Sequence, residues 1–169
     1  MFEAKSPSVL TPAENELVIE RVFDAPREKV WRMWTEPENI MKWWGPIGFT
    51  APYARLDLHV GGKYLYCMKG PDGREYWSGG IFREIVPTER IVATDSFTDG
   101  EGNLVPASFY GLSADYPMEL MLTVAFEDTG NGKTRLTIRH VGHPPGQDME
   151  GARMGWNTSL DKFAEALAK

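Results

Sequence analysis

The longest regular run of hydrophobic positions lies at the end of the chain, between Gln147 and Ala168. Apolar side chains recur there at steps of three and four residues, which is the spacing of one face of an α-helix. They are Met149, Ala152, Trp156, Leu160, Phe163 and Leu167. Charged and polar residues fall on the opposite side, so the sequence predicts an amphipathic helix that lays one face on the rest of the domain. At about 1.5 Å per residue, such a helix is roughly 33 Å long and crosses a small domain.

Upstream of this helix, apolar and polar residues alternate over short stretches, which is typical of β-strands. A first strand is predicted around Leu17–Phe23. Six more are predicted as a meander, with turns at Gly70–Gly73 and at the hairpin dipeptide Asn131-Gly132. The six stretches are Thr50–Val60, Lys63–Lys69, Glu75–Val86, Ile91–Phe97, Leu120–Phe126 and Leu136–His140.

Two short helices are predicted between the first strand and the meander. Pro26 suits the first turn of one and Pro37 the first turn of the other. Thr35 and Glu38 have the spacing of a capping box, which predicts that the second helix begins at Thr35. Residues 1–14 show no periodicity and are expected to form a flexible arm, so residues 15–169 are assigned to one domain. The predicted fold class is α+β, with a curved antiparallel sheet, two short helices and a long C-terminal helix.

The segment Thr98–Pro117 interrupts the strand pattern. It contains three glycines and two prolines together with several large apolar residues. A loop this long in a compact domain is usually functional or disordered, and the aromatic residues argue against disorder. We interpret it as a flap packed over an opening; the alternative is a loop that covers an edge strand.

Composition narrows the classes of function. The 169 residues suit one domain, and 18 basic against 24 acidic residues give a net charge of −6. With no basic run, this charge argues against binding to nucleic acid or to an anionic membrane surface. The single cysteine, Cys67, excludes an internal disulfide and a cysteine-based zinc site. The sequence has no secretory signal pattern and no apolar run of membrane-spanning length, so we expect a cytoplasmic protein.

A series of short motifs carries a family resemblance. Together they resemble the AHSA-type group named after the activator of the Hsp-ninety ATPase, within the START-like superfamily of polyketide cyclases, dehydrases and lipid-transport proteins (SRPBCC). The resemblance covers about residues 16 to 168. The motifs are Ala25-Pro26, Val30-Trp31, Trp34-Thr35-Glu36-Pro37-Glu38, Trp43-Trp44-Gly45-Pro46, Gly48-Phe49-Thr50, Asp57-Leu58, Val60-Gly61-Gly62, Gly70-Pro71-Asp72-Gly73, Glu84-Ile85-Val86-Pro87 with Glu89-Arg90, and Gly155-Trp156.

The resemblance implies the helix-grip fold, in which a curved antiparallel sheet holds the long helix and an apolar cavity lies between them. It does not fix a function, because relatives include ligand carriers, cyclases, a self-sacrificing resistance protein and a co-chaperone domain. The function must therefore be argued from the site.

If the concave face of the sheet opposes the helix, the alternation selects the residues that line the cavity. Plain core packing is the alternative for each apolar member. Gly79-Gly80 could shift the register by one residue, which makes Trp77, Phe82 and Phe97 weaker candidates. The stronger candidates are Tyr64, Tyr66, Met68, Leu122, Val124, Ile138 and His140 from strands, Trp44 and Phe49 from the helical corner, Tyr110 from the flap, and Met149, Arg153 and Trp156 from the long helix.

Polar candidates matter more, because burying them costs free energy unless they find partners. Arg153 could point inward and bind a carboxylate or phenolate, or it could extend to water at the edge of the stripe. His140 could be an acid–base group or a hydrogen-bonded core histidine. Three carboxylates could be buried, with a salt bridge or a turn-stabilising role favoured. They are Asp57, Glu84 and Asp95.

Several kinds of site are not expected. His140 and His143 have no carboxylate at metal-binding spacing, so we expect no metal. No base is visibly placed to activate Cys67. The sequence has no nucleophile elbow, no phosphate-binding loop and no dinucleotide fingerprint, so we expect no cofactor.

Three hypotheses follow. The first is a module that binds a small apolar molecule, cyclic or aromatic, in an internal cavity. The second is an enzyme of the cyclase or dehydrase type that uses acid–base residues there. The third is a co-chaperone-like interaction domain. We expect no chaperone partner, because chaperone activators of the group usually carry an additional N-terminal domain; pairing into a homodimer is left open.

Overall fold

The computed structural model describes residues 13–169, so most of the predicted N-terminal arm lies outside the described residues. These described residues form seven strands, two short α-helices, one 3-10 helix and one long α-helix. In order they are β1 (Glu16–Phe23), α1 (Arg27–Thr35), α2 (Pro37–Ile40), β2 (Thr50–Leu56), β3 (Lys63–Lys69), β4 (Glu75–Val86), β5 (Arg90–Thr98), η1 (Ala107–Tyr110), β6 (Leu120–Gly130), β7 (Lys133–Val141) and α3 (Gln147–Leu167).

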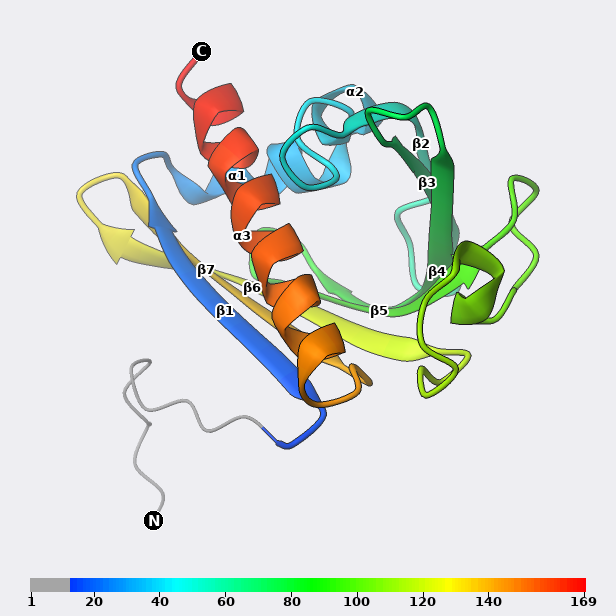
Figure 1. The fold of residues 1–169 in the computed structure, drawn as a ribbon. Coiled ribbons are helices and arrows are strands. Elements are labelled where there is room, and N and C mark those ends of the chain that lie inside the picture. Colours follow the sequence, from blue (N-terminus) through cyan, green and yellow to red (C-terminus); the bar gives the residue numbers. More distant parts are fainter. Residues whose placement is uncertain (1–12) are drawn as a thin grey trace.

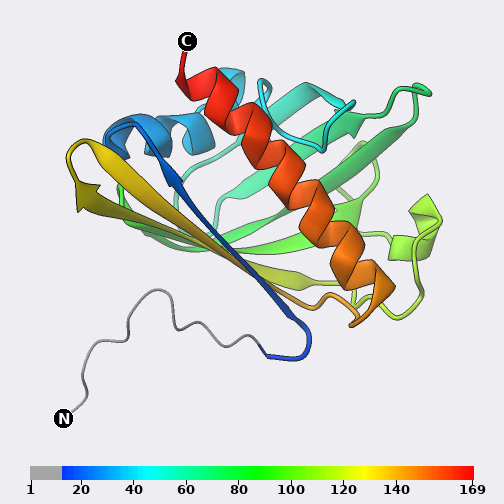
Figure 2. The ribbon, with the colours of Figure 1, turned by 60° about the vertical axis from the view of Figure 1, so that its left-hand side comes forward.

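All seven strands form one antiparallel sheet in the order β1-β7-β6-β5-β4-β3-β2. The sheet is strongly curved, and α3 runs diagonally across its concave side (Figure 1). The second view shows α1 and α2 beside the C-terminal half of α3, at one end of the curved sheet (Figure 2). The predicted α+β class and helix-grip arrangement are confirmed.

The β6–β7 hairpin forms where the sequence predicts it. Its two-residue loop is Asn131-Gly132, and both residues have positive φ, at 57° and 72°. A two-residue turn of this kind matches the natural twist of paired strands, and Asn and Gly adopt positive φ at low cost. β7 then pairs along its other edge with β1, which makes the N-terminal strand one edge of the sheet.

One end of the space between sheet and helix is packed solid with aromatic residues. Trp43 and Phe163 are fully buried, and their ring centroids lie 4.9 Å apart. The Trp43 indole donates a hydrogen bond of 2.8 Å to the carbonyl of Met33, so its one polar atom is satisfied. Trp34 packs against the same two rings, at 4.6 and 5.9 Å between centroids.

Two details of the sequence prediction are corrected. The capping box is absent: Thr35 ends α1, its hydroxyl donates to the carbonyl of Trp31, and Glu36 is the N-cap of α2. Thr35 is nearly buried, so its hydroxyl takes an acceptor inside its own helix. β2 also stops at Leu56 rather than Val60, because the backbone turns through residues 57–62.

The register of β4 settles which of its residues face the concave side. β3 and β4 pair regularly from Lys69↔Glu75 to Lys63↔Ile81, and the irregularity between β4 and β5 falls after Phe82. Gly79-Gly80 therefore causes no register shift. A Cβ on Gly80 would lie 1.9 Å from the carbonyl oxygen of Thr94, so glycine permits the close approach of β5.

Candidate functional site

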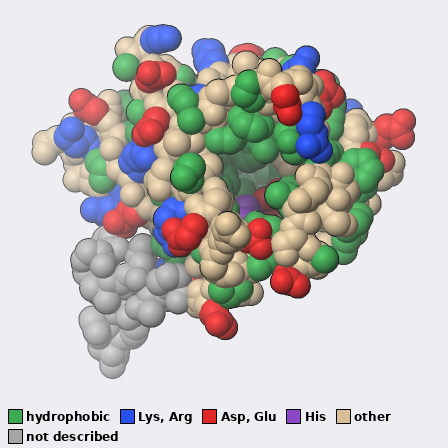
Figure 3. All heavy atoms as spheres, in the orientation of Figure 1, with side chains coloured by type: hydrophobic (Ala, Val, Ile, Leu, Met, Phe, Trp, Pro, Cys, Tyr) green, Lys and Arg blue, Asp and Glu red, His purple; other side chains and the backbone are tan. Residues whose placement is uncertain are grey.

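A cavity of about 440 Å³ lies between the N-terminal half of α3 and the wall formed by β3, β4 and β5. The space-filling view shows it as a hollow with mainly hydrophobic walls and a histidine in its depth (Figure 3). Its lining consists of Trp44, Gly45, Pro46, Met68, Tyr76, Trp77, Ser78, Asp95, Phe97, Leu112, Tyr116, His140, His143, Gln147, Asp148, Gly151, Ala152, Gly155, Trp156 and Ser159.

The cavity exists because α3 presents small residues at this end. Gly151, Ala152, Gly155 and Ser159 recur at helical spacing along the lining. A Cβ built on Gly151 or Gly155 would meet no other heavy atom within 4 Å. The space beside the helix is therefore open, whereas Leu160 and Phe163 on the following turns fill it.

Part of the predicted lining falls on the cavity and part does not. Of the predicted residues, Trp44, Met68, Trp77, Phe97, His140 and Trp156 line it. Five more surround a nearly filled space of about 20 Å³ deeper in the core: Tyr64, Tyr66, Phe82, Leu122 and Val124. Trp77 borders the cavity, but its ring packs on Tyr53 with centroids 5.5 Å apart.

Five predicted lining residues lie elsewhere. Ile138 and Met149 belong to the buried core cluster. Phe49 is half-buried and packs on Tyr76 with ring centroids 6.0 Å apart. Tyr110 belongs to the flap candidate and is buried, and its hydroxyl accepts from the backbone N–H of Trp77 and donates to the carbonyl of Thr98. The fifth is Arg153.

Arg153 does not line the cavity. Its side chain is 41% exposed, and its Nε lies 3.3 Å from the Glu150 carboxylate one turn earlier on the outer side of α3. Of the two alternatives for this residue, the structure shows the one that reaches solvent.

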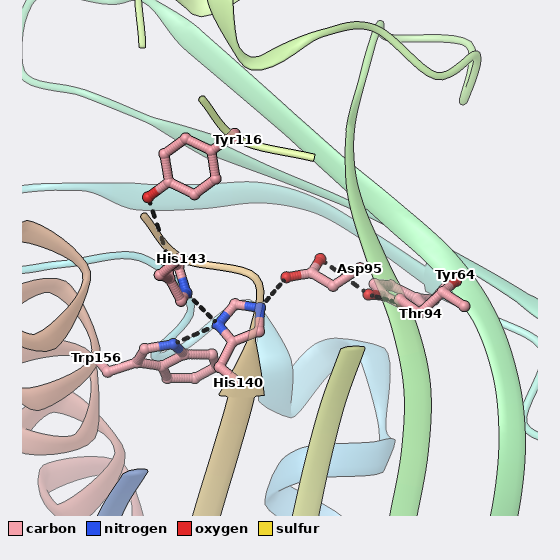
Figure 4. A network of polar contacts seen from close by, with 7 residues as sticks. All are labelled: Tyr64, Thr94, Asp95, Tyr116, His140, His143 and Trp156. Carbon is pink, nitrogen blue, oxygen red and sulfur yellow. Dashed lines mark hydrogen bonds and ion pairs between the residues drawn. The ribbon is translucent and has the colours of Figure 1, made fainter. Parts of the chain in front are cut away.

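A continuous chain of polar side chains crosses the inner wall of the cavity (Figure 4). His140 Nε2 lies 2.7 Å from Asp95 Oδ2, and His140 Nδ1 lies 2.9 Å from His143 Nε2. The Tyr116 hydroxyl lies 3.0 Å from His143 Nδ1, and the Trp156 indole N–H donates to His140 Nδ1 at 3.2 Å. The linked residues come from β5, the loop before β6, β7, the loop between β7 and α3, and α3 itself, which only the fold brings together.

The donors in this chain assign the histidine tautomers. An indole N–H can only donate, so His140 Nδ1 accepts and its proton sits on Nε2, facing the Asp95 carboxylate. His143 then donates from Nε2 to His140 and accepts the Tyr116 hydroxyl at Nδ1. Every hydrogen bond in this series of side chains is therefore donated in the direction of Asp95. The other oxygen of Asp95 lies 3.0 Å from the hydroxyl of Tyr64.

Burial shapes the ionisation of these groups. Desolvation, with a smaller contribution from the neighbouring His140, lowers the pKa of His143 from its ordinary 6.5 to about 3. Desolvation and then the charge of Asp148 raise the pKa of Tyr116 to about 12. His143 is therefore neutral and Tyr116 remains a hydrogen-bond donor near neutral pH. Such a pair can orient a polar ligand group through hydrogen bonds.

The remaining polar candidates have structural roles. Asp57 is exposed and lies 2.8 Å from Nδ1 of the exposed His59, while Glu84 pairs with Arg90 through two contacts of 2.9 and 3.0 Å. Burial, and to a lesser degree Glu75, raises the pKa of the Cys67 thiol to about 11, so it is not a ready nucleophile.

The sequence predicts His140 in the site but not the role of its neighbours. The sequence pattern favours a structural role for Asp95, offers His143 only as a candidate metal ligand, and does not select Tyr116 or Asp148. One signal could have found Asp95: it alternates with Ala93 and Phe97 on the face of β5 that opposes the helix. Among residues 13–169, no group of three His, Cys, Asp or Glu side chains is placed to hold a metal ion.

Comparison with known proteins identifies similar folds. A sequence model for the family described as Activator of Hsp90 ATPase homolog 1-like protein matches residues 24–168. No curated protein matches the chain. In the part of the chain that the structure describes, no helix combines the length and apolar character that crossing a membrane requires.

Three solved bacterial structures illustrate the similarity. A protein from Nitrosomonas europaea is 27% identical with a TM-score of 0.74, covering 94% of this chain and 97% of its own. One from Chromobacterium violaceum is 28% identical with a TM-score of 0.73, covering 92% and 98%. One from Arthrobacter aurescens is 26% identical with a TM-score of 0.75, covering 92% and 87%.

Proposed function

Because this chain belongs to the family of Activator of Hsp90 ATPase homolog 1-like proteins, we propose that it binds a small, mainly apolar molecule in the cavity beside α3. The observation that carries this proposal is the contrast between a well-packed core and a cavity of about 440 Å³ in the same domain. Protein interiors are close-packed, and cavities of a few hundred Å³ with few polar groups are typical of ligand sites.

The shape of the lining favours a cyclic or aromatic ligand. Trp44, Tyr76, Phe97 and Trp156 present flat rings from different sides of the cavity. Aromatic walls favour flat apolar partners through stacked and edge-to-face contacts. The polar chain that ends at Tyr116 would fix the orientation of one polar group on such a ligand.

The test is ligand binding by wild-type protein and by a variant with a filled cavity. Native mass spectrometry of the protein purified from its own host would detect a retained molecule, and thermal shift with a panel of bicyclic aromatic compounds would detect binding. Gly155→Leu should abolish both signals, because its side chain would enter the cavity. Glu165→Leu is the matched control, since it adds the same side chain at an exposed position of α3. Binding that survives Gly155→Leu would place the ligand elsewhere.

A second candidate is acid–base catalysis in the same cavity. It is favoured by the chain Asp95–His140–His143–Tyr116, which resembles the arrangement of a base oriented by a carboxylate. A suitable probe is deuterium exchange into 2-tetralone in heavy water, because a base that removes an α proton lets solvent deuterium replace it. Exchange above the uncatalysed rate that disappears in His143→Gln, with tetralone binding intact, would establish catalysis. If 2-tetralone binds but shows no deuterium exchange above the uncatalysed rate, catalysis is ruled out for this substrate and only the binding function is supported.

A further inference from the structure

The cavity is acidic as well as aromatic. Two carboxylates line it, Asp95 on β5 and Asp148 in the first turn of α3. None of the described residues in its lining is Lys or Arg. The chain as a whole is also acidic, with a net charge of −6. The electrostatic field inside this cavity is therefore set by two negative charges within apolar walls.

The charge of Asp95 has hydrogen bonds but no counter-charge. Its oxygens lie 2.7 Å from His140 Nε2, which is neutral in the tautomer assigned above, and 3.0 Å from the neutral Tyr64 hydroxyl, whose one proton is shared with the carbonyl of Thr94 at 2.7 Å. The carboxylate side chain is only 16% exposed. A buried charge is costly unless an opposite charge compensates it, and the described residues that line the cavity supply none.

Asp148 adds to the negative field. It forms no ion pair with the described residues, and after burial its charge is the second cause that raises the pKa of Tyr116. The N-terminus of α3 has a partial positive charge that would favour an anion, but Asp148 and Glu150 already occupy its first turn.

Cationic side chains on neighbouring segments are engaged outside the lining. Lys162 donates to two backbone carbonyls of the segment before β2, at 3.0 and 3.3 Å. Arg153 pairs with Glu150, and Arg74 lies over the Tyr76 ring, 5.3 Å from its centroid. These cations do not enter the lining, so they leave the cavity carboxylates available to a ligand.

We propose that the ligand of this cavity carries a cationic amine on its aromatic or cyclic body. The ammonium group would pair with Asp95 or Asp148, and the body would lie on the aromatic walls, which also attract cations. This inference rests on the proposed function, because it names the chemical class of the molecule bound at that site. It reverses the preference for an anionic ligand that an inward-pointing Arg153 would have implied.

Three probes with one aromatic body test the charge preference. They are 1-naphthylmethylamine, 1-naphthylmethanol and 1-naphthoic acid, measured by calorimetry at pH 7 and low salt. The amine should bind about tenfold or more tightly than the alcohol, as expected for a charge-assisted hydrogen bond, and the acid should bind weakest. Raising the salt concentration should weaken binding of the amine more than that of the alcohol.

Matched variants locate the effect. Asp148→Asn and Asp95→Asn should each reduce affinity for the amine about tenfold while leaving affinity for the alcohol nearly unchanged. Glu150→Gln is the control, because it removes one charge from the same helical turn but outside the cavity lining. Asp148→Asn keeps the test informative if Asp95→Asn fails to fold.

The possible outcomes distinguish a failure of the amine preference from a failure of the proposed ligand-binding function. Equal or tighter binding of the alcohol or the acid, blocked by Gly155→Leu, would overturn the amine preference and leave the binding function standing. An amine preference that Glu150→Gln abolishes as strongly as Asp148→Asn would also overturn it. If none of the three probes binds, both the amine preference and binding of a flat aromatic ligand in this cavity fail.

Discussion

The two halves of α3 meet the same sheet in opposite ways. In the C-terminal half, Leu160 and Phe163 are fully buried and close one end of the domain. In the N-terminal half, Gly151 and Gly155 leave open space beside the helix. The difference is one of side-chain size along a single helix, and it turns one end into a packed core and the other into a cavity.

Polar groups follow the same division. At the packed end, the Trp43 indole finds a carbonyl and the neighbouring side chains are apolar. At the hollow end, Asp95, His140 and His143 are largely buried although each is an ionisable residue type. Buried titratable groups lower stability unless they are satisfied, so the packed end supplies free energy that lets the hollow end hold them. Four predictions test this division of roles.

The largest expected effect is at the packed end. Phe163→Ala should lower the free energy of unfolding by about 3–5 kcal/mol, because it removes a fully buried ring from contact with Phe23, Trp34 and Trp43. Leu112→Ala, in the cavity lining and 41% exposed, should cost less than about 1 kcal/mol. Urea denaturation monitored by tryptophan fluorescence measures both. Similar losses for the two would mean that the ends do not differ in their contribution to stability.

The second effect is acid sensitivity of the hollow end. Because the pKa of His143 falls from 6.5 to about 3 on folding, the unfolded chain takes up a proton at higher pH than the folded one. The part of the folding stability that depends on a neutral His143 is fully present above pH 6.5 and is lost as the pH falls toward 3. By pH 5 this loss should reach about 2 kcal/mol. His143→Gln should flatten this part of the stability profile, whereas His59→Gln, which removes an exposed histidine, should not.

The fold could be predicted well because hydrophobic periodicity and turn residues, which can be read over a few neighbouring positions, determine most of its elements. The step of three and four from Met149 to Leu167 places α3, and the dipeptide Asn131-Gly132 places the last hairpin. The bounds of β3 and β4 match the alternation to the residue. The predicted helix boundary failed at Thr35, because its hydroxyl bonds to a carbonyl of its own helix, α1, and does not cap α2.

The site was harder to predict because its parts converge from distant segments. His140 and Asp95 are 45 positions apart, and only the pairing of β5, β6 and β7 puts them on one face. The sequence also cannot tell a cavity from a core when the lining residues are aromatic in both cases. Tyr64 and Met68 share a face of β3, yet Tyr64 surrounds a nearly filled space and Met68 lines the cavity.

A smaller effect comes from the open space at Gly155. Gly155→Ala should raise the free energy of unfolding by about 0.5–1 kcal/mol, because alanine favours the helix and its Cβ meets no neighbour within 4 Å. Thermal denaturation in the absence of ligand measures it. A destabilised Gly155→Ala would mean that the space beside α3 is not open in solution, which would remove the contrast between the two halves of the helix.

The smallest expected effect is that of replacing Arg153. This replacement tests whether the arginine contacts the ligand or only forms a surface ion pair. The ion pair with Glu150 is exposed on both sides, at 41% and 68%, so Arg153→Ala should change stability by less than about 0.5 kcal/mol. It should also leave binding of the naphthyl probes unchanged, because the guanidinium lies outside the cavity lining. If Arg153→Ala instead weakened binding of 1-naphthoic acid alone, the arginine would turn inward when an anion enters. The hollow end would then select ligands through a mobile cation on the helix and not through the fixed carboxylates of its walls.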